Sequence, residues 1–360
     1  IYLTDDNPRN ENPKNIRDDI KKGIKRRKVI EISNRAKAII TAIQNLYTGD
    51  ILLVAGKGHE QTQDIGNKHV YFSDKQIILD AIKIKNKNLS DNFKFNIIKE
   101  VSGYKKHLSC KFLKKARINS NEVKKNDIFF AIKGKKNDGN KFVKHSFKRK
   151  ASAAIVNRIQ KNTYTKKQIK VKDTLKFLTK ISKIFRNNLK AQIIAITGSC
   201  GKTTLKELLG NSLNQINKTS ISPKSYNNKY GVPLSLFNID QKDSYGVLEV
   251  GMDKKGEIDY LSKIIQPDVS VITNVNYAHA KNFKNIKQIA LAKSEIIYNT
   301  KKNGYVVLNA DDFFFKLHKK IANKQNLKII SFGVKNQNAN VKLINIKRNR
   351  KFFKINISIG

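Results

Sequence analysis

Residues 193–204 read Ile-Ile-Ala-Ile-Thr-Gly-Ser-Cys-Gly-Lys-Thr-Thr, an apolar run that leads into a glycine-bounded loop ending in Lys202 and Thr203. Apolar residues recur at helical spacing just after the loop, which predicts a buried strand, a loop and a helix in succession. Glycines let successive N–H groups face an anion, a lysine supplies positive charge for the β- and γ-phosphates, and a threonine hydroxyl can ligate Mg²⁺. The helix N-terminus also favours phosphate. This stretch therefore predicts a phosphate-binding loop and the use of ATP or GTP.

The loop residues expected to contact the nucleotide are Gly198, Ser199, Cys200, Gly201, Lys202, Thr203 and Thr204. The spacing is G-x-x-G-K-T, and Ile196 stands where the commoner G-x-x-x-x-G-K-T form has its first glycine. The alternative is a strand-to-helix turn that ends in Lys-Thr by chance. We favour the phosphate-binding interpretation because the strand and the helix are both present in the pattern.

The length and composition indicate a soluble, cytoplasmic protein. A chain of 360 residues is long enough for two or three domains with their own cores. No stretch approaches the roughly 18 uninterrupted apolar residues of a membrane span, and the first residues do not resemble a signal peptide. The two cysteines, Cys110 and Cys200, lack companion ligand spacing, so neither a disulfide framework nor a zinc site is expected.

The formal net charge of +45 is typical of proteins that bind nucleic acid, because Lys and Arg release counterions from phosphate backbones. Here the lysines are spread along the whole chain, without a zinc finger, an aromatic RNA-binding motif or a basic tail. A lysine-rich solvated surface explains this distribution better. We expect no specific nucleic-acid partner, and a non-enzymatic basic nucleic-acid-binding protein remains an alternative.

The chain is predicted to be α/β, with three α/β units. The first has helix patterns at 15–26, 33–46 and 74–84 and a buried run at 51–55, and a polar stretch at 85–99 follows as a linker. The second has short strands at 127–132 and 151–156 and a helix at 174–186. The third has buried runs at 193–196, 247–250, 269–273 and 305–308 and a helix at 286–299. This alternation predicts a mainly parallel sheet flanked by helices, with ligands at the carboxyl ends of its strands.

Polar residues fall where the strands of the third unit should end. Glu249 closes the second run, where a carboxylate can hold Mg²⁺ directly or through water. A charge inside an apolar strand is costly without a partner, which favours a functional role. Asn274 and His279 follow the third run, and Asn309 follows the fourth. By themselves, His279 can be structural or a ligand, Asn309 can cap a helix, and Lys293 would be an exposed helix lysine.

Together these motifs resemble the central domain of the Mur ligases, the ATP-dependent amide-forming enzymes of peptidoglycan synthesis. They occur in family order, as Thr197–Thr204, Asn227–Pro233, Glu249–Ile258, Thr273–His279 and Ala292–Ile296. The resemblance implies that Lys293 becomes carbamylated and acts as an anion for Mg²⁺. The implied catalytic residues are Lys202, Lys293, His279 and Glu249, and the implied metal ligands are Thr203, Glu249, His279 and Lys293. It further implies that Asn274 and Asn309 contact ATP, and that Asn227 and Asn228 contact substrate.

Within the family, the last motifs look most like the branch that adds D-alanyl-D-alanine to the UDP-N-acetylmuramoyl tripeptide. The second unit resembles the family's UDP-binding domain through Asp127–Asn140, with Ser120 implied in substrate binding. Asn119, Asn121 and Asn140 stand where the family usually has Asp, Arg and His, so the affinity of the uridine site is in doubt.

The first unit resembles the carboxy-terminal domain of the member that adds meso-diaminopimelate. Asp6, Asn7, Pro8 and Arg9 match its D-N-P-R motif, and Gly56 and Glu60 belong to a G-K-G-H-E motif. The resemblance implies that Arg9 pairs with the free carboxylate of diaminopimelate, a task that suits a bidentate guanidinium. By themselves, the two motifs could be a plain turn and a tight loop.

The resemblance predicts a fragment of a fused, bifunctional ligase. The expected domains are 1–88 (carboxy-terminal type), 89–105 (linker), 106–188 (UDP-binding type) and 189–360 (central, ATP-binding). The chain opens with Ile1 and its sole methionine is Met252, which favours an internal piece of a longer protein. A third domain of the second ligase is expected beyond Gly360, so we expect nucleotide binding but poor turnover by these residues alone. Another Mur-type ligase, such as a folylpolyglutamate synthase, remains an alternative.

Overall fold

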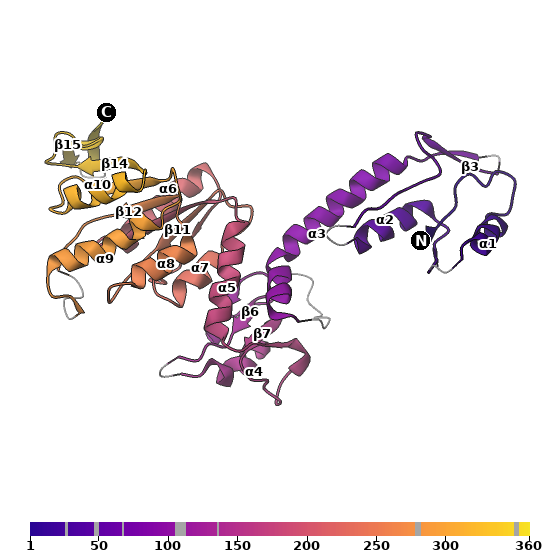
Figure 1. Cartoon of the computed structure of the whole chain (residues 1–360), viewed down its shortest axis with the longest axis horizontal. Coiled ribbons are helices and arrows are strands. Elements are labelled where there is room, and N and C mark those ends of the chain that lie inside the picture. Colours follow the sequence, from indigo (N-terminus) through magenta and orange to yellow (C-terminus); the bar gives the residue numbers. More distant parts are fainter. Residues whose placement is uncertain are drawn as a thin grey trace. The chain divides into compact units, whose positions relative to one another are not determined.

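The computed structural model describes residues 1–25, 28–46, 50–66, 68–104, 113–134, 137–277, 282–348 and 353–360, apart from the side chains of 86–92. The described chain is α/β and forms two compact units, residues 1–93 and 94–360 (Figure 1). No described helix is both long and apolar enough to cross a membrane.

The first unit surrounds a small core with short elements. Strands β1 (Tyr2–Leu3) and β2 (Ile30–Glu31) pair in parallel, and β3 (Thr62–Ile65) and β4 (Lys68–Tyr71) form an antiparallel hairpin. Helices α1 (Pro13–Gly23) and α2 (Arg35–Asn45) begin after asparagines whose side chains accept backbone N–H bonds at the helix start. Both helices were predicted from their apolar spacing.

The apolar run at 51–55 is not the buried strand that its composition predicts. Ile51 and Leu53 are 95% and 86% exposed, whereas Leu52 and Val54 pack against the core of α2 and α3. In an extended segment successive side chains point to opposite faces, so only every second residue reaches the core. Burial of the whole run was therefore a wrong prediction.

Helix α3 (Asp74–Ser102) extends well past the predicted end at residue 84 and runs through the stretch 85–99 that we expected to be a linker. The boundary between the two compact units falls within this helix, between residues 93 and 94. Its last turns carry buried apolar residues, including Phe95, Ile97 and Ile98. Polar residues are compatible with helical backbone hydrogen bonds, so the polar composition of this segment did not imply a linker.

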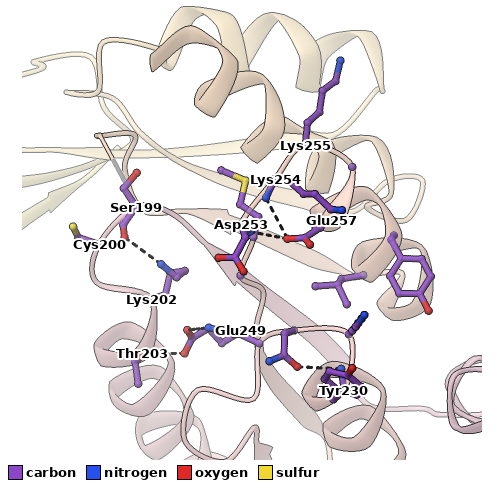
Figure 2. Close-up of a pocket in the computed structure, with 18 of the residues that line it drawn as sticks. Ser199, Cys200, Lys202, Thr203, Tyr230, Glu249, Asp253, Lys254, Lys255 and Glu257 are labelled. Atoms are coloured by element: carbon purple, nitrogen blue, oxygen red, sulfur yellow. Dashed lines mark hydrogen bonds between the residues drawn. The ribbon is translucent and has the colours of Figure 1, made fainter. Parts of the chain in front are cut away.

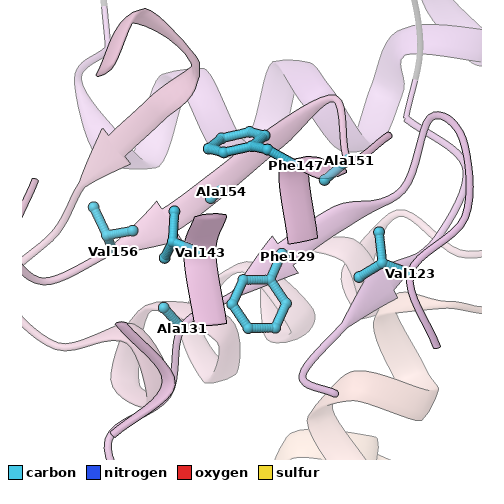
Figure 3. Close-up of a cluster of buried hydrophobic side chains, with 8 residues drawn as sticks. All are labelled: Val123, Phe129, Ala131, Val143, Phe147, Ala151, Ala154 and Val156. Atoms are coloured by element: carbon cyan, nitrogen blue, oxygen red, sulfur yellow. The ribbon is translucent and has the colours of Figure 1, made fainter. Parts of the chain in front are cut away.

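The second unit contains two sheets. The smaller one is a parallel sheet of β5 (Ala116–Arg117), β6 (Ile128–Phe130), β7 (Ala153–Val156) and β8 (Gln168–Lys170), in that order. The short turns η1 (Ser120–Glu122), η2 (Gly139–Phe142) and η3 (Thr165–Lys167) and helix α4 (Val143–Lys148) connect its strands. Figure 3 shows side chains from β6, α4 and β7 meeting in one buried apolar cluster.

The larger sheet has the strand order β10-β11-β9-β12-β13-β14-β15-β16 in the described chain. Neighbouring strands are parallel except for the final pair. The strands are β9 (Gln192–Thr197), β10 (Thr219–Ile221), β11 (Tyr245–Glu249), β12 (Val269–Ile272), β13 (Tyr305–Asn309), β14 (Lys328–Gly333), β15 (Val341–Arg348) and β16 (Phe353–Ile359). The predicted α/β class, with a mainly parallel sheet flanked by helices, is confirmed.

The helices that flank the larger sheet are α6 (Lys202–Ile216), α7 (Gly231–Phe237), α8 (Glu257–Ile265), α9 (Ile286–Tyr298) and α10 (Phe315–Lys324). Strand β9 comes first in the chain but lies inside the sheet, with β11 on one side and β12 on the other. The strand order thus reverses beside β9. Such a switch point opens a crevice at the carboxyl ends of the strands, and the glycine loop follows β9 at this position.

Helix α5 (Thr174–Asn187) joins the two sheets of the second unit. Its Ser182 hydroxyl donates to the carbonyl of Pro233 at 2.8 Å. Its Arg186, almost fully buried, donates to the carbonyl of Ile265 at 2.7 Å and pairs with Asp268 at 2.7 Å. The second and third units expected from the sequence therefore form a single compact body.

Candidate nucleotide-binding site

The glycine loop between β9 and α6 has a backbone path that requires its glycines. Gly198 has a φ of 151°, and a Cβ there would lie 1.8 Å from Oγ1 of Thr273. Gly201 has a φ of 79° and is the residue before the first turn of α6. Both angles lie where side chains are disfavoured. The predicted strand, loop and helix are confirmed.

The end of the neighbouring strand β12 holds this loop. The N–H groups of Ser199 and Cys200 donate to the carbonyl and to Oδ1 of Asn274, each at 3.0 Å. Thr273 donates from its hydroxyl to the carbonyl of Cys200 at 2.7 Å. Asn274 is therefore next to the loop, as predicted, and braces its backbone. The sequence analysis assigned no role to Thr273. Its position at the same strand end as Asn274 could have indicated that it also contacts the loop.

The ammonium group of Lys202 bends back over its own loop. It donates to the carbonyls of Gly198 and Ser199 at 2.8 and 3.2 Å. A lysine in this place can exchange carbonyl partners for phosphate oxygens, which as charged acceptors make stronger hydrogen bonds. The loop geometry thus fits the phosphates of a nucleotide.

Thr203 and Glu249 meet beside the loop. The Thr203 hydroxyl donates to Oε2 of Glu249 at 2.8 Å, and Nδ2 of Asn227 donates to Oε1 at 2.7 Å. Glu249 is 1% exposed. A hydroxyl and a carboxylate are the oxygen donors that Mg²⁺ takes in phosphate sites, where waters and substrate phosphates complete its shell. In the described chain no three His, Cys, Asp or Glu residues cluster as a metal site, so such an ion would depend on those further ligands.

Lys293 on α9 is buried, which its sequence pattern alone does not reveal. It is 2% exposed, and it makes no hydrogen bond or ion pair with another described residue. Burial, and next the positive charge of Lys202, lower its pKa to about 7. A substantial fraction of this amine is therefore neutral near pH 7. His279 lies outside the described residues.

A cavity of about 870 Å³ opens in front of the loop. Figure 2 shows Lys202, Thr203 and Glu249 together on one side of it, and Asp253, Lys254 and Glu257 on another. The lining residues are Ser199–Thr204, Asn227–Tyr230, Glu249, Gly251–Glu257, Tyr260 and Leu261. Asn227 and Asn228, which we expected to contact substrate, lie among these lining residues. Residues 252–257, Tyr260 and Leu261 also line the cavity, although the sequence analysis assigned them no role in the site.

Asn309 is not among the residues that line this cavity. Its Nδ2 donates to the carbonyl of Thr273 at 3.3 Å, and its Oδ1 accepts from the N–H of Asp311 at 3.0 Å. Asp312, in the same turn, accepts from the N–H of Val275 at 2.7 Å. This turn supports the segment that braces the glycine loop, so both the capping and the nucleotide interpretations of Asn309 remain compatible with its place.

In the smaller sheet, Oγ of Ser120 lies 3.0 Å from Nδ1 of His145, a residue that the sequence did not single out. Asn119 accepts from the N–H of Asn121 at 3.0 Å and so shapes the turn that carries Ser120. Asn140 is 1% exposed and donates to Asp138 at 2.6 Å. The residues that depart from the family motif are therefore held in ordered turns.

In the first unit, the two motif segments converge on a buried lysine. Lys57 donates to Oδ1 of Asn7 at 3.0 Å and lies 3.4 Å from Glu60 and 3.6 Å from Asp6. Hydrogen bonds from Asn7 and Lys57 lower the pKa of Glu60. Lys57 was not anticipated as the centre of this group.

The remaining motif residues of the first unit lie around this group. Gly56, with a φ of 116°, approaches Asp6 so closely that a Cβ would lie 3.0 Å from its Oδ2. Pro8 is buried and Arg9 is exposed. The structure thus brings together four of the predicted residues and leaves the Arg9 side chain at the surface.

The parallel sheet, the switch point and the glycine loop are typical of P-loop α/β domains. Residues 196–359 match the model of the Mur ligase middle domain, and residues 1–58 match that of the Mur ligase glutamate ligase domain. These two parts of the chain are thus each similar to a domain of the Mur ligases.

Curated ligases are similar to this chain over part of their length. The UDP-N-acetylmuramoyl-tripeptide–D-alanyl-D-alanine ligase of Buchnera aphidicola subsp. Acyrthosiphon pisum is 38% identical over 209 residues, which are 58% of this chain and 45% of the relative. That of Rickettsia prowazekii is 34% identical over 229 residues, 63% of this chain and 51% of the relative. The chain thus spans about half the length of the curated relatives it matches.

Solved structures show the same fold. MurF from Acinetobacter baumannii has a TM-score of 0.63 and 29% identity, covering 73% of this chain and 58% of that one. MurF ligase from Thermotoga maritima in complex with ADP has a TM-score of 0.57 and 29% identity, covering 68% and 56%.

Proposed function

We propose that this chain belongs to an ATP-dependent ligase that joins D-alanyl-D-alanine to UDP-N-acetylmuramoyl tripeptide. The names of the relatives support this activity. The observation that carries it is the hydrogen-bonded set of Thr203, Glu249 and Asn227 beside the glycine loop, which lines a cavity of about 870 Å³.

The proposed reaction has two steps. A carboxylate oxygen of the tripeptide attacks the γ-phosphorus of ATP, the bond to the β–γ bridging oxygen breaks, and ADP leaves with its electron pair. The amine of D-alanyl-D-alanine then attacks the acyl carbon of the resulting acyl phosphate, loses a proton and expels inorganic phosphate. Both steps need positioning and charge neutralisation more than covalent help from the protein.

The residues of the chain have distinct proposed roles in these steps. Lys202 neutralises the transferring phosphoryl group, and the loop residues from Gly198 to Thr204 hold the phosphates, with Asn274 and Asn309 nearby. Mg²⁺, held by Thr203 and Glu249 and in our proposal also by His279, would supply positive charge at the phosphate oxygens. Asn227 orients Glu249, and Asn228 contributes to the substrate side of the cavity.

We also propose that Lys293 is carbamylated. A neutral amine is needed to attack carbon dioxide, and the burial of Lys293 lowers its pKa to about 7. The product is a carbamate, with release of one proton. This changes a buried cation near Lys202 into an anion that can ligand Mg²⁺, which removes the repulsion between the two lysines.

Residues 1–58 support the proposal of a fused enzyme, because a Mur ligase glutamate ligase domain here precedes a middle domain in the chain. We propose that it is the tail of a meso-diaminopimelate-adding ligase, with Arg9 free to bind the carboxylate of that amino acid. Asp6, Asn7, Pro8, Gly56 and Glu60 would shape the same site. The domain limits 1–88, 106–188 and 189–360 are part of this proposal, with a connecting segment 89–105 that is helical as far as Ser102, and so is a cytoplasmic location.

Binding measurements on the chain test the proposal without requiring turnover. A fluorescent ATP analogue should bind in the presence of Mg²⁺, and Lys202→Ala should weaken this binding by at least about tenfold, equivalent to about 1.4 kcal/mol. Lys320→Ala, which removes an exposed lysine on α10, is the matched control and should have no effect.

Calorimetry with UDP-N-acetylmuramoyl tripeptide tests the substrate. Binding of this ligand supports the peptidoglycan assignment, including the doubtful uridine site around Ser120. Nucleotide binding without any binding of the UDP-peptide would contradict it and favour a Mur-type ligase with another substrate. Polyanion binding that is steeply salt-dependent and insensitive to Lys202→Ala would instead indicate the nucleic-acid alternative.

A further inference from the structure

A loop of the larger sheet, residues 222–230, contacts the nucleotide site on its inner side. We call it the bridging loop. Its Asn227 holds Glu249 at 2.7 Å, and the carbonyl of Asn227 accepts from the N–H of Gly251 at 2.8 Å. A Cβ on Gly251 would lie 2.9 Å from the Asn227 side chain. Because the packing around Asn227 is so close, a shift of the loop backbone should also move the Glu249 carboxylate.

On its outer side the bridging loop contacts the smaller sheet. Glu122, the last residue of η1, accepts from Nζ of Lys224 at 3.3 Å and from the hydroxyl of Tyr226 at 3.5 Å. Arg117 lies 3.8 Å from the same carboxylate. The Glu122 side chain is 30% exposed, so its charge is only partly screened by water. Glu122 thus connects the two parts of the second unit one residue away from Asn227.

The conformation of the bridging loop needs such support. Lys224 has a φ of 49°, in the left-handed region that is costly for a residue with a side chain. A strained residue persists only where its surroundings hold it. The carbonyl of Lys224 accepts from the buried Lys206 at 2.6 Å, and its side chain is held by Glu122. Lys206 lies on helix α6, which follows the glycine loop, and Glu122 lies in turn η1 beside the smaller sheet.

We propose that Glu122 is a positioning residue of the Mg²⁺–nucleotide site, acting through Tyr226 and Asn227 on the direction of the Glu249 carboxylate. The proposal rests on the proposed function in one respect. The turn that carries Glu122 also carries Asn119 and Ser120, so a UDP-peptide bound there would act on the same contact and couple its own binding to that of the nucleotide.

The test is the Mg²⁺ dependence of ADP binding by the full chain carrying Glu122→Gln. Binding of a fluorescent ADP analogue is measured with saturating Mg²⁺ and with a chelator. We expect the factor by which Mg²⁺ tightens binding to fall about two- to fivefold, the range for a partly exposed ion pair, while binding in the chelator stays unchanged. An unchanged Mg²⁺ factor overturns the proposal. So does an equal loss under both conditions, since that would indicate a merely structural role.

Two further variants keep the result interpretable. Glu31→Gln in the first unit is the matched control, because Glu31 is 28% exposed and also pairs with an arginine and a lysine. Tyr226→Phe removes only the hydroxyl contact and should reproduce part of the loss, with a non-additive effect in the double variant. Additive effects of the two substitutions would contradict a shared path, and Tyr226→Phe serves the test alone if Glu122→Gln does not fold.

A further binding measurement on the full chain distinguishes failure of this proposal from failure of the proposed function. In the wild type, UDP-N-acetylmuramoyl tripeptide should change the affinity for Mg²⁺–ADP, and Glu122→Gln should abolish that change. Binding of the UDP-peptide without any such coupling overturns the coupling while leaving the proposed function intact. No binding of the UDP-peptide contradicts the proposed function, and the Mg²⁺ factor of Glu122→Gln then decides the positioning role by itself.

Discussion

The hydroxyl of Thr203 donates to a carboxylate oxygen of Glu249 at 2.8 Å, although the two residues are 46 positions apart in the chain. Thr203 lies in the first turn of the helix that follows β9, and Glu249 ends the adjacent strand β11. The parallel pairing of these strands places both at the carboxyl edge of the sheet. The strand pairing thereby brings together the two oxygen ligands that we propose for Mg²⁺.

Replacement of this carboxylate should remove the Mg²⁺ dependence of nucleotide binding. Glu249→Gln keeps the shape of the side chain but loses its charge, and we expect Mg²⁺ to tighten ADP binding at least about tenfold less than in the wild type. Binding in a chelator should change little. Removal of an almost fully buried charge offsets the loss of one of the two carboxylate acceptors used by Thr203 and Asn227, so Tm should change little. A large drop in Tm would contradict a mainly electrostatic role.

Gly198→Ala should destabilise the protein and abolish nucleotide binding. The added Cβ would meet the Thr273 hydroxyl at 1.8 Å, at a φ of 151°. We expect a loss of about 2–4 kcal/mol in the free energy of unfolding, measured by denaturant titration. Gly103→Ala, where φ is 65° and no atom lies within 4 Å of the new Cβ, should cost about 1 kcal/mol. Equal effects of the two substitutions would show that the Thr273 contact is irrelevant.

Carbamylation of Lys293 can be observed directly. Incubation with isotope-labelled bicarbonate should give a carbamate signal in the carbon NMR spectrum of the chain, because the low pKa leaves a neutral amine to react with carbon dioxide. The signal should be absent in Lys293→Arg, whose guanidinium stays charged, and present in the exposed-lysine control Lys320→Arg. A wild-type spectrum identical to that of Lys293→Arg would refute the modification.

Stability should depend on pH through Lys94. Burial, together with the nearby Lys115, lowers the pKa of Lys94 to about 8 against the opposing effect of Asp240 and Asp243. Between about pH 8 and the ordinary value of 10.5 the unfolded chain binds more protons than the folded one, so this residue's contribution to stability rises with pH across that window. Below about pH 8 the Lys94 amine is charged in both the folded and the unfolded chain, so burying that charge destabilises the fold by its full amount.

Lys94→Met should therefore stabilise the chain most at low pH. We expect a gain of about 1–3 kcal/mol at about pH 7 that shrinks by about pH 9.5, measured by urea unfolding. The aliphatic replacement can still pack against Phe185 and Phe237, whose rings lie 5.1 and 5.7 Å from the Lys94 ammonium. A gain that is constant with pH would assign the effect to packing alone.

Some features of this protein follow from local sequence. The strand, glycine loop and helix around 193–216 are predicted by apolar spacing and backbone freedom, which are properties of neighbouring residues. The same holds for β11, β12, β13 and α9, whose positions match the apolar runs and the helical pattern that predict them. Where local pattern and burial diverge, as at 51–55 and along α3, composition predicts the wrong boundary.

The sequence by itself therefore determined the strand, glycine loop and helix and the α/β class, because these depend on the spacing and chemical type of neighbouring residues. It also proposed the residues for phosphate and metal. Only the tertiary structure decided which of them meet. Lys293 becomes buried through the packing of α9, Asn227 reaches Glu249 because β10 and β11 are neighbours, and Glu122 reaches Tyr226 across two sheets. Contacts between distant segments depend on strand order and helix packing, and no local pattern encodes these.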